Sequence, residues 1–253
     1  MNMTFDEYIK NPAGIKNAVY SHREMYRNLY IEKLDKIMLR ETGKIDYTLY
    51  KSKNEYYVHM KIPSEVVPQF YYDTVVMFYT DNKEISVSKS LSQYYVKFYS
   101  NDPSFVYTFA HAMLENDLFI RDLVPRMSKQ AVLKVAKVKN PKNEIGYVKS
   151  LYFLYLLMKR DNLFDKLVFE SRGKAYNKKQ LLKNITHADH KIQARQNAQD
   201  ELSKKNKREK TKLNIPKETR NPNIVTKMVS KTKKITTPKK ISSSNKAKTI
   251  KKI

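Results

Sequence analysis

Lysine and arginine recur at short spacing from residue 204 to the end of the chain, and this spacing suits the binding of a polyanion. Cations along a chain neutralise the phosphates of a nucleic acid and release its counterions, so that about eight contacts predict a salt slope near −7 on a duplex. Phosphate contacts do not read bases, so we expect sequence-tolerant binding, to DNA more than to RNA. The candidate nucleic-acid-binding residues are Lys204, Lys205, Lys207, Arg208, Lys210, Lys231, Lys233, Lys234, Lys239 and Lys240.

The same region contains one short motif and leaves two alternatives open. Thr237-Pro238-Lys239-Lys240 resembles the Ser/Thr-Pro-Lys-Lys element of linker-histone tails, which lies along AT-rich minor grooves. A basic segment also suits an acidic surface on a protein or assembly partner, or it increases solubility without a specific partner. Nucleic acid is the partner that the sequence favours.

Aromatic and basic residues alternate along two predicted strands. These residues are Tyr57, His59, Lys61, Tyr95, Lys97 and Tyr99. Sheet faces of this composition hold single-stranded nucleic acid by stacking. However, the glycine-bearing signature of the RNA-recognition motif is missing, and tyrosine on such a strand more often packs beneath a helix. We therefore favour a packed role for these side chains.

Residues suited to catalysis or metal binding are sparse. The chain has no cysteine and only 4 glycines, which excludes cysteine-ligated zinc and nearly excludes a glycine-rich phosphate loop. His187 and His190 lie three residues apart on a predicted helix with Asp189 nearby, but the pattern specifies no third ligand and the segment is basic. We expect no metal, no cofactor and no enzymatic activity.

The charge distribution predicts how the chain is divided. Residues 171–253 hold 25 Lys and Arg against 5 Asp and Glu, a net charge of +20, whereas residues 1–170 have a net charge of only +5. Every Phe and Tyr lies at or before Tyr176. We predict a globular domain over 1–170, a basic and weakly amphipathic helix over 171–210, and a disordered Lys-rich tail over 211–253, because the tail lacks apolar side chains to offset chain entropy.

The first half of the predicted domain contains two helices and then strands. Thr4 and Glu7 form a capping box for a short helix, and a longer helix is predicted over residues 17–41. Alternating apolar residues on both sides of a turn at 51–54 predict a β-hairpin. Residues 70–80 are apolar on both faces, which predicts a central strand. Residues 94–99 predict a further strand. The segment between these two strands is predicted to be a loop or a weak edge strand.

The second half of the predicted domain is helical. Asp102 and Pro103 predict the start of one helix, a short helix follows from Ser128, and a longer one is predicted over 144–160. The expected class is α+β, with helices packed on one face of a small antiparallel sheet. The longest apolar run, Leu151–Met158, is far shorter than the ~20 residues of a membrane span, so we expect no membrane contact. The acidic start of the chain shows no secretion signal, which favours the cytoplasm.

Five short segments carry a family resemblance, at residues 11–14, 20–25, 61–65, 98–103 and 146–150. They read Asn-Pro-Ala-Gly, Tyr-Ser-His-Arg-Glu-Met, Lys-Ile-Pro-Ser-Glu, Phe-Tyr-Ser-Asn-Asp-Pro and Gly-Tyr-Val-Lys-Ser. Over residues 3–200 the chain resembles uncharacterised proteins encoded by tailed bacteriophages of low-GC hosts. The resemblance assigns no site residues, but it implies a protein made in the bacterial cytoplasm that acts on phage DNA or is part of the virion.

Two functions follow as leading hypotheses, and a third alternative is a small enzyme whose site residues come together only in three dimensions. The first is a non-enzymatic, nucleic-acid-associated phage protein whose basic C-terminal region binds phosphates while the domain mediates docking or self-association. The second is a virion structural or assembly protein whose tail contacts an acidic phage structural protein or packaged DNA.

Overall fold

The structure, a computed structural model, describes residues 2–10, 47–64, 66–146 and 148–213. It divides the chain into one unit, Met1–Lys210, and a second, Thr211–Ile253. The helix predicted over 17–41 and the tail predicted to be disordered lie outside the described residues, apart from positions 211–213.

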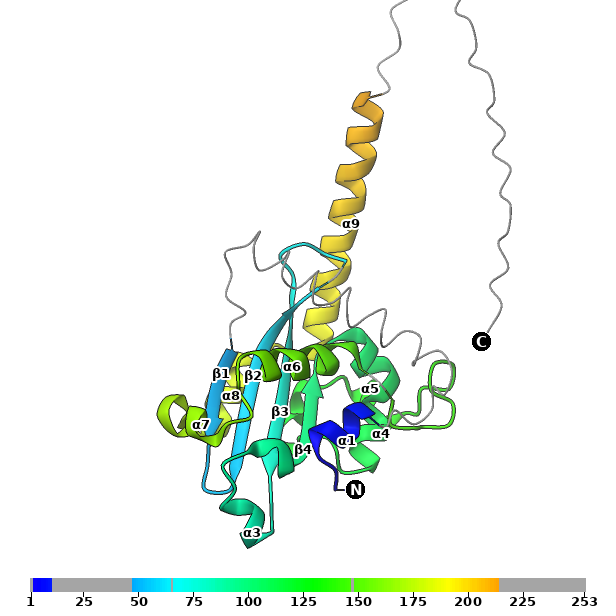
Figure 1. Ribbon diagram of the computed structural model, residues 1–253. Helices are drawn as coiled ribbons and strands as arrows, with labels where there is room; N and C mark the ends of the chain where they lie inside the picture. Colours follow the sequence, from blue (N-terminus) through cyan, green and yellow to red (C-terminus); the bar gives the residue numbers. More distant parts are fainter. Residues whose placement is uncertain (1, 11–46, 65, 147, 214–253) are drawn as a thin grey trace, which may run out of the picture. The chain divides into compact units, whose positions relative to one another are not determined.

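The described part of the first unit is built on a five-stranded sheet (Figure 1). Strands β1 (Tyr47–Lys51), β2 (Glu55–Pro63), β3 (Tyr71–Tyr79) and β4 (Tyr95–Ser100) form an antiparallel meander, which confirms the predicted hairpin and central strand. The two-residue strand β5 (Lys174–Ala175) pairs with β1 in parallel, so the order is β4-β3-β2-β1-β5. The α+β class is therefore confirmed, with a mixed rather than a purely antiparallel sheet.

One face of the sheet packs against α1 (Phe5–Lys10) and α6 (Lys149–Arg160). The capping box forms as predicted: the backbone N–H of Thr4 donates to Glu7 Oε2 (2.7 Å), and the N–H of Glu7 donates to Thr4 Oγ1 (3.2 Å). The cap positions Phe5, whose ring lies 5.1 Å from that of Phe98 and 6.3 Å from that of Phe78. These buried contacts hold the start of the chain on the sheet.

Helix α6 ends at the predicted residue but begins five residues later than predicted, at Lys149. Asn140 accounts for the delay, because its side chain donates to the carbonyl of Glu144 (2.8 Å) and accepts from the N–H of Glu144 (3.0 Å). The backbone of Glu144 is thus held in a loop. The loop then brings Gly146 against the ring of Phe109, where a Cβ atom would lie 2.0 Å from Cε1.

The other helices are short. Residues 83–93 form α3 (Lys83–Ser86) and the 3₁₀ helix η1 (Leu91–Gln93), where the sequence predicted a loop or weak strand. The helix predicted at Asp102 starts there and passes through a π-helical turn, η2 (Phe105–Phe109), into α4 (Ala110–Glu115). A 3₁₀ helix, η3 (Arg121–Arg126), precedes α5 (Lys129–Leu133), which confirms the helix predicted from Ser128, and α7 (Lys166–Arg172) follows α6.

The second face of the sheet is also covered, where the sequence predicted helices on one face only. Figure 1 shows α8 (Lys178–Asn184) and α6 on opposite sides of the sheet. Asn184 donates to the hydroxyl of Tyr50 on β1 (3.2 Å), and the backbone N–H of Thr186 donates to Asp73 on β3 (3.2 Å). Alternate strand residues point to opposite faces, and those on this second face include the buried Tyr57, Val75 and Tyr99 as well as the buried polar residues His59 and Asp73.

Residues 171–210 form more than the single basic helix predicted. They include β5, α8 and then α9 (Ala188–Leu213), with a break between the two helices at 185–187. The side chains of Leu181, Ile185, Ala188 and Ile192 are buried against the domain. The chain forms one unit up to Lys210 that includes these four residues, whereas the sequence predicted that the globular domain ends at residue 170.

Candidate nucleic-acid interface

The basic end of α9 carries the predicted phosphate-binding residues that the structure describes. Lys204, Lys205, Lys207 and Arg208 lie on α9 with exposed side chains, and Lys210 lies on the same helix. At 1.5 Å rise per residue, the first four cations fall within ~6 Å along the axis. The remaining candidates, Lys231, Lys233, Lys234, Lys239 and Lys240, lie outside the described residues.

The helical state of this end follows from its charge pattern more than from packing. Asp200 and Glu201 each precede a lysine by four residues, the spacing and polarity that stabilise a helix. Cations in the last turns also interact favourably with the negative end of the helix dipole. The helix therefore presents its positive charges to solvent.

A second basic segment lies within the folded domain, and sequence analysis missed it. Between Asp122 and Glu144 there are six Lys and Arg residues and no acid. Three of them, Lys134, Lys137 and Lys139, are exposed around a pocket of about 660 Å³. A charge count in windows of about twenty residues would have identified this segment, whereas a count over the whole domain averaged it out.

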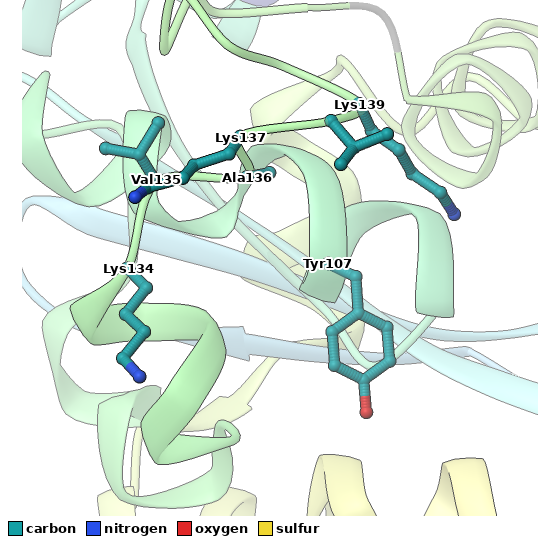
Figure 2. A pocket seen from close by; sticks show the side chains of 7 residues that line it. Tyr107, Lys134, Val135, Ala136, Lys137 and Lys139 are labelled. Atoms are coloured by element: carbon teal, nitrogen blue, oxygen red, sulfur yellow. The ribbon is translucent and has the colours of Figure 1, made fainter.

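Apolar and aromatic side chains complete the lining of this pocket (Figure 2). Tyr107 lies on the turn η2 and is 42% exposed, and the apolar part of the lining also includes Val135, Ala136 and Val138. Burial, followed by the negative charge of Asp189, raises the pKa of Tyr107, whose phenol would be neutral at physiological pH even with its ordinary pKa of about 10. The pocket thus combines an uncharged aromatic ring with three cations.

The aromatic strand residues that suggested a stacking platform are covered. Tyr57 is 2% exposed, and its ring stacks on Tyr176 with 4.3 Å between centroids and 4° between planes. Tyr99 is fully buried and donates to the carbonyl of Arg126 (3.2 Å), while Lys97 forms an ion pair with Asp117 (2.8 Å). The packed role that we favoured from the sequence is confirmed for Tyr57 and Tyr99, whereas Tyr95 is half-buried and Lys61 is exposed.

A buried polar cluster lies beneath the start of α9. The carboxylate of Asp73, 3% exposed as a residue, lies 3.1 Å from His59 Nε2 and accepts from Asn101 Nδ2 (2.9 Å) and the backbone N–H of Thr186 (3.2 Å). Burial acts to raise the pKa of Asp73, but His59, Thr186 and the charge of Lys191 together hold it below its ordinary value. The cluster joins strands β2 and β3 to the segment that leads into α9.

The same cluster forms one wall of a small polar pocket of about 270 Å³. Its lining consists of Thr48, His59, Lys61 and Asn184. The pKa of Lys191 is lowered by burial and by the charge of Lys61, and Asp73 acts against both. The lining offers hydrogen bonds and one cation but lacks a carboxylate. From the sequence, His59 was considered only as part of the stacking platform.

The histidine pair adds no further chemistry among the described residues. The rings of His187 and His190 have centroids 5.5 Å apart, and His187 Nδ1 accepts from the N–H of Asp189 (3.3 Å). In the described ranges no three His, Cys, Asp or Glu side chains gather as a metal site would require.

None of the described helices combines the length and apolar character needed to cross a membrane. Comparisons with protein-family models, with curated proteins and with solved structures give no match to this chain.

Proposed function

We propose that this protein is a non-enzymatic, nucleic-acid-associated protein encoded by a tailed bacteriophage, and that its basic C-terminal region binds phosphates without reading sequence. The observation that carries the proposal is the segregation of charge, with a net +20 over residues 171–253. Four of these cations lie exposed within about one turn of α9, a spacing at which adjacent phosphates of a duplex are within reach.

The basic segment at 123–143 supports the same proposal. It adds six cations to the folded unit, so positive charge is not confined to the C-terminal region. Summed positive potential of this kind raises the rate of encounter with a polyanion and the affinity at low salt.

The test is a titration of full-length protein against a labelled duplex DNA at increasing salt. A variant with Lys204, Lys205, Lys207 and Arg208 all changed to Gln is expected to lower the slope of log K against log[salt] by about 3–4, since each phosphate contact contributes ~0.9. The matched control changes four exposed lysines elsewhere to Gln, at Lys53, Lys83, Lys89 and Lys183. Failure of the full-length protein to bind at low salt contradicts the proposal, and so does an equal loss of slope in the control.

The second candidate function is a virion structural or assembly protein, favoured by the resemblance to phage proteins. In that case the C-terminal cations contact an acidic phage protein or packaged DNA. Mass spectrometry of purified particles is expected to find many copies of this protein per virion. Absence of the protein from the particles eliminates this candidate.

A further inference from the structure

We infer that the pocket between Tyr107 and residues 134–139 holds an unpaired base of single-stranded nucleic acid, with Tyr107 as the stacking ring and Lys134, Lys137 and Lys139 as the phosphate contacts. The inference rests on the proposed function and adds a substrate class to it. It assigns to the folded domain a contact that distinguishes single strands from duplexes, which the cations of α9 do not.

The lining of the pocket matches the surface of a base. A base has two apolar faces and polar edges, and the lining of this pocket includes the ring of Tyr107 and the apolar residues Val135, Ala136 and Val138. Figure 2 shows Tyr107 beside the segment that carries Lys134, Val135, Ala136, Lys137 and Lys139. Val138 is 93% exposed and the nearby Leu133 is 74% exposed, so apolar surface is accessible to a ligand here. The volume of about 660 Å³ lies within the range of pockets that hold small ligands.

The charge around the pocket selects an anionic ligand. All three lysines of the lining are exposed, and neither the lining nor the chain from Leu123 to Asn143 contains a carboxylate; the charge of Asp189 acts on Tyr107 from outside the lining. The ring itself is uncharged at neutral pH, as any phenol with an ordinary or raised pKa is. A ligand with a flat apolar group between phosphates therefore satisfies every side chain of the lining.

The geometry favours a single strand over a duplex. Bases in a duplex are stacked on their neighbours and show only their edges, so a base can lie face to face with Tyr107 only when it is unpaired. A second hollow of about 190 Å³ shares Tyr107 and Lys134 with the first. It adds Thr108 and Gln130, whose side chains offer hydrogen bonds to the edge of a base.

The test compares three labelled 15-residue DNA probes of equal charge per strand with full-length protein: oligothymidine, an abasic oligomer, and a duplex. Tyr107→Leu keeps an apolar side chain but removes the ring, and is expected to weaken oligothymidine binding about tenfold. Binding to the abasic probe and the duplex is expected to stay within about twofold. Tyr107→Phe keeps the ring and is expected to bind as the natural protein does.

The lysines are tested in the same way. Changing Lys134, Lys137 and Lys139 to Gln is expected to lower the salt slope on oligothymidine by about 2, since each contact on a single strand contributes ~0.7. The matched control changes Lys53, Lys83 and Lys89, which are equally exposed. If Tyr107→Leu weakens binding to the abasic probe as much as to oligothymidine, or leaves both unchanged, the inference is overturned while the proposed function stands. If the natural protein binds none of the probes at low salt, the proposed function fails as well.

Discussion

Replacement of Asp73 tests whether the buried polar cluster holds the end of the domain together. In Asp73→Asn one oxygen of the side chain is retained, and it satisfies the two donors at Oδ2, which are Asn101 Nδ2 and the backbone N–H of Thr186. The amide nitrogen then faces His59 Nε2 in place of Oδ1. The substitution thus preserves shape and removes the charge.

The expected cost follows from the contacts that are lost. Hydrogen bonds to a buried charged group contribute ~1.5–3 kcal/mol each, so the loss of the His59 contact lowers the free energy of unfolding by about 2 kcal/mol in Asp73→Asn. Asp73→Ala removes every acceptor, so that His59 Nε2 and the backbone N–H of Thr186 lose this partner and Asn101 Nδ2 keeps only the carbonyl of Thr186. It is expected to cost about 3–5 kcal/mol. The side chain of Asp73 is 4% exposed, so solvent does little to replace the lost partners.

The pH dependence gives a second measure of the same cluster. The pKa of Asp73 in the folded protein lies below its value in the unfolded chain. The unfolded state therefore binds the proton more tightly, and the stability that the carboxylate contributes is complete above the unfolded pKa of about 4. This contribution is lost as the pH falls through the folded pKa, so the natural protein is expected to lose more stability below about pH 4 than Asp73→Asn does.

Urea unfolding of the full chain, followed by circular dichroism between pH 3 and pH 7, measures both effects. Asp81→Asn is the matched control, because Asp81 is exposed at the end of β3 and its loss is expected to change stability by less than about 0.5 kcal/mol. Equal stability of Asp73→Asn and the natural protein at pH 7 would refute the energetic role of the cluster. Parallel pH profiles for the two proteins would refute the assigned direction of the pKa.

Two further predictions concern packing. In Gly146→Ala the new Cβ would lie 2.0 Å from Phe109 Cε1, so overpacking is expected to lower the free energy of unfolding by about 2 kcal/mol. Adding Phe109→Leu in the same chain is expected to recover part of the loss in urea unfolding, and an unchanged stability of the single variant would contradict the packing described. A chain ending at residue 170 lacks Tyr176, which stacks on Tyr57, and it is expected to unfold at lower urea and less cooperatively than a chain ending at 210. Coincident unfolding curves would place the domain edge at 170 after all.

Local structure was largely predictable because its causes lie close together in the chain. The capping box of Thr4 and Glu7, the start of a helix at Asp102 and the period-two alternation of the hairpin are each set by residues a few positions apart. Helix α6 is the informative exception. Its start depends on Asn140, whose side chain competes for the backbone of Glu144, and the sequence contained no local sign of that competition.

The candidate interface was predictable only in part. The cations of α9 were found from composition, since an apolar-poor and Lys-rich segment has no core in which to place them. The pocket at Tyr107 was missed, because a lone tyrosine on one turn and a lysine-bearing segment some thirty residues later have no visible relation until the fold brings them together. The tyrosines of the strands, which did look like a binding surface, are buried by Tyr176 and η3.

The α+β class, most positions of the described elements and the segregation of positive charge follow from composition and from the periodicity of neighbouring residues. The fold was needed to see that residues 174–192 cover the second face of the sheet, that Asp73 meets Thr186 across 113 positions, and that three lysines surround Tyr107. These are contacts between distant segments, and their free energy comes from burial and hydrogen bonding that exist only once the chain has folded.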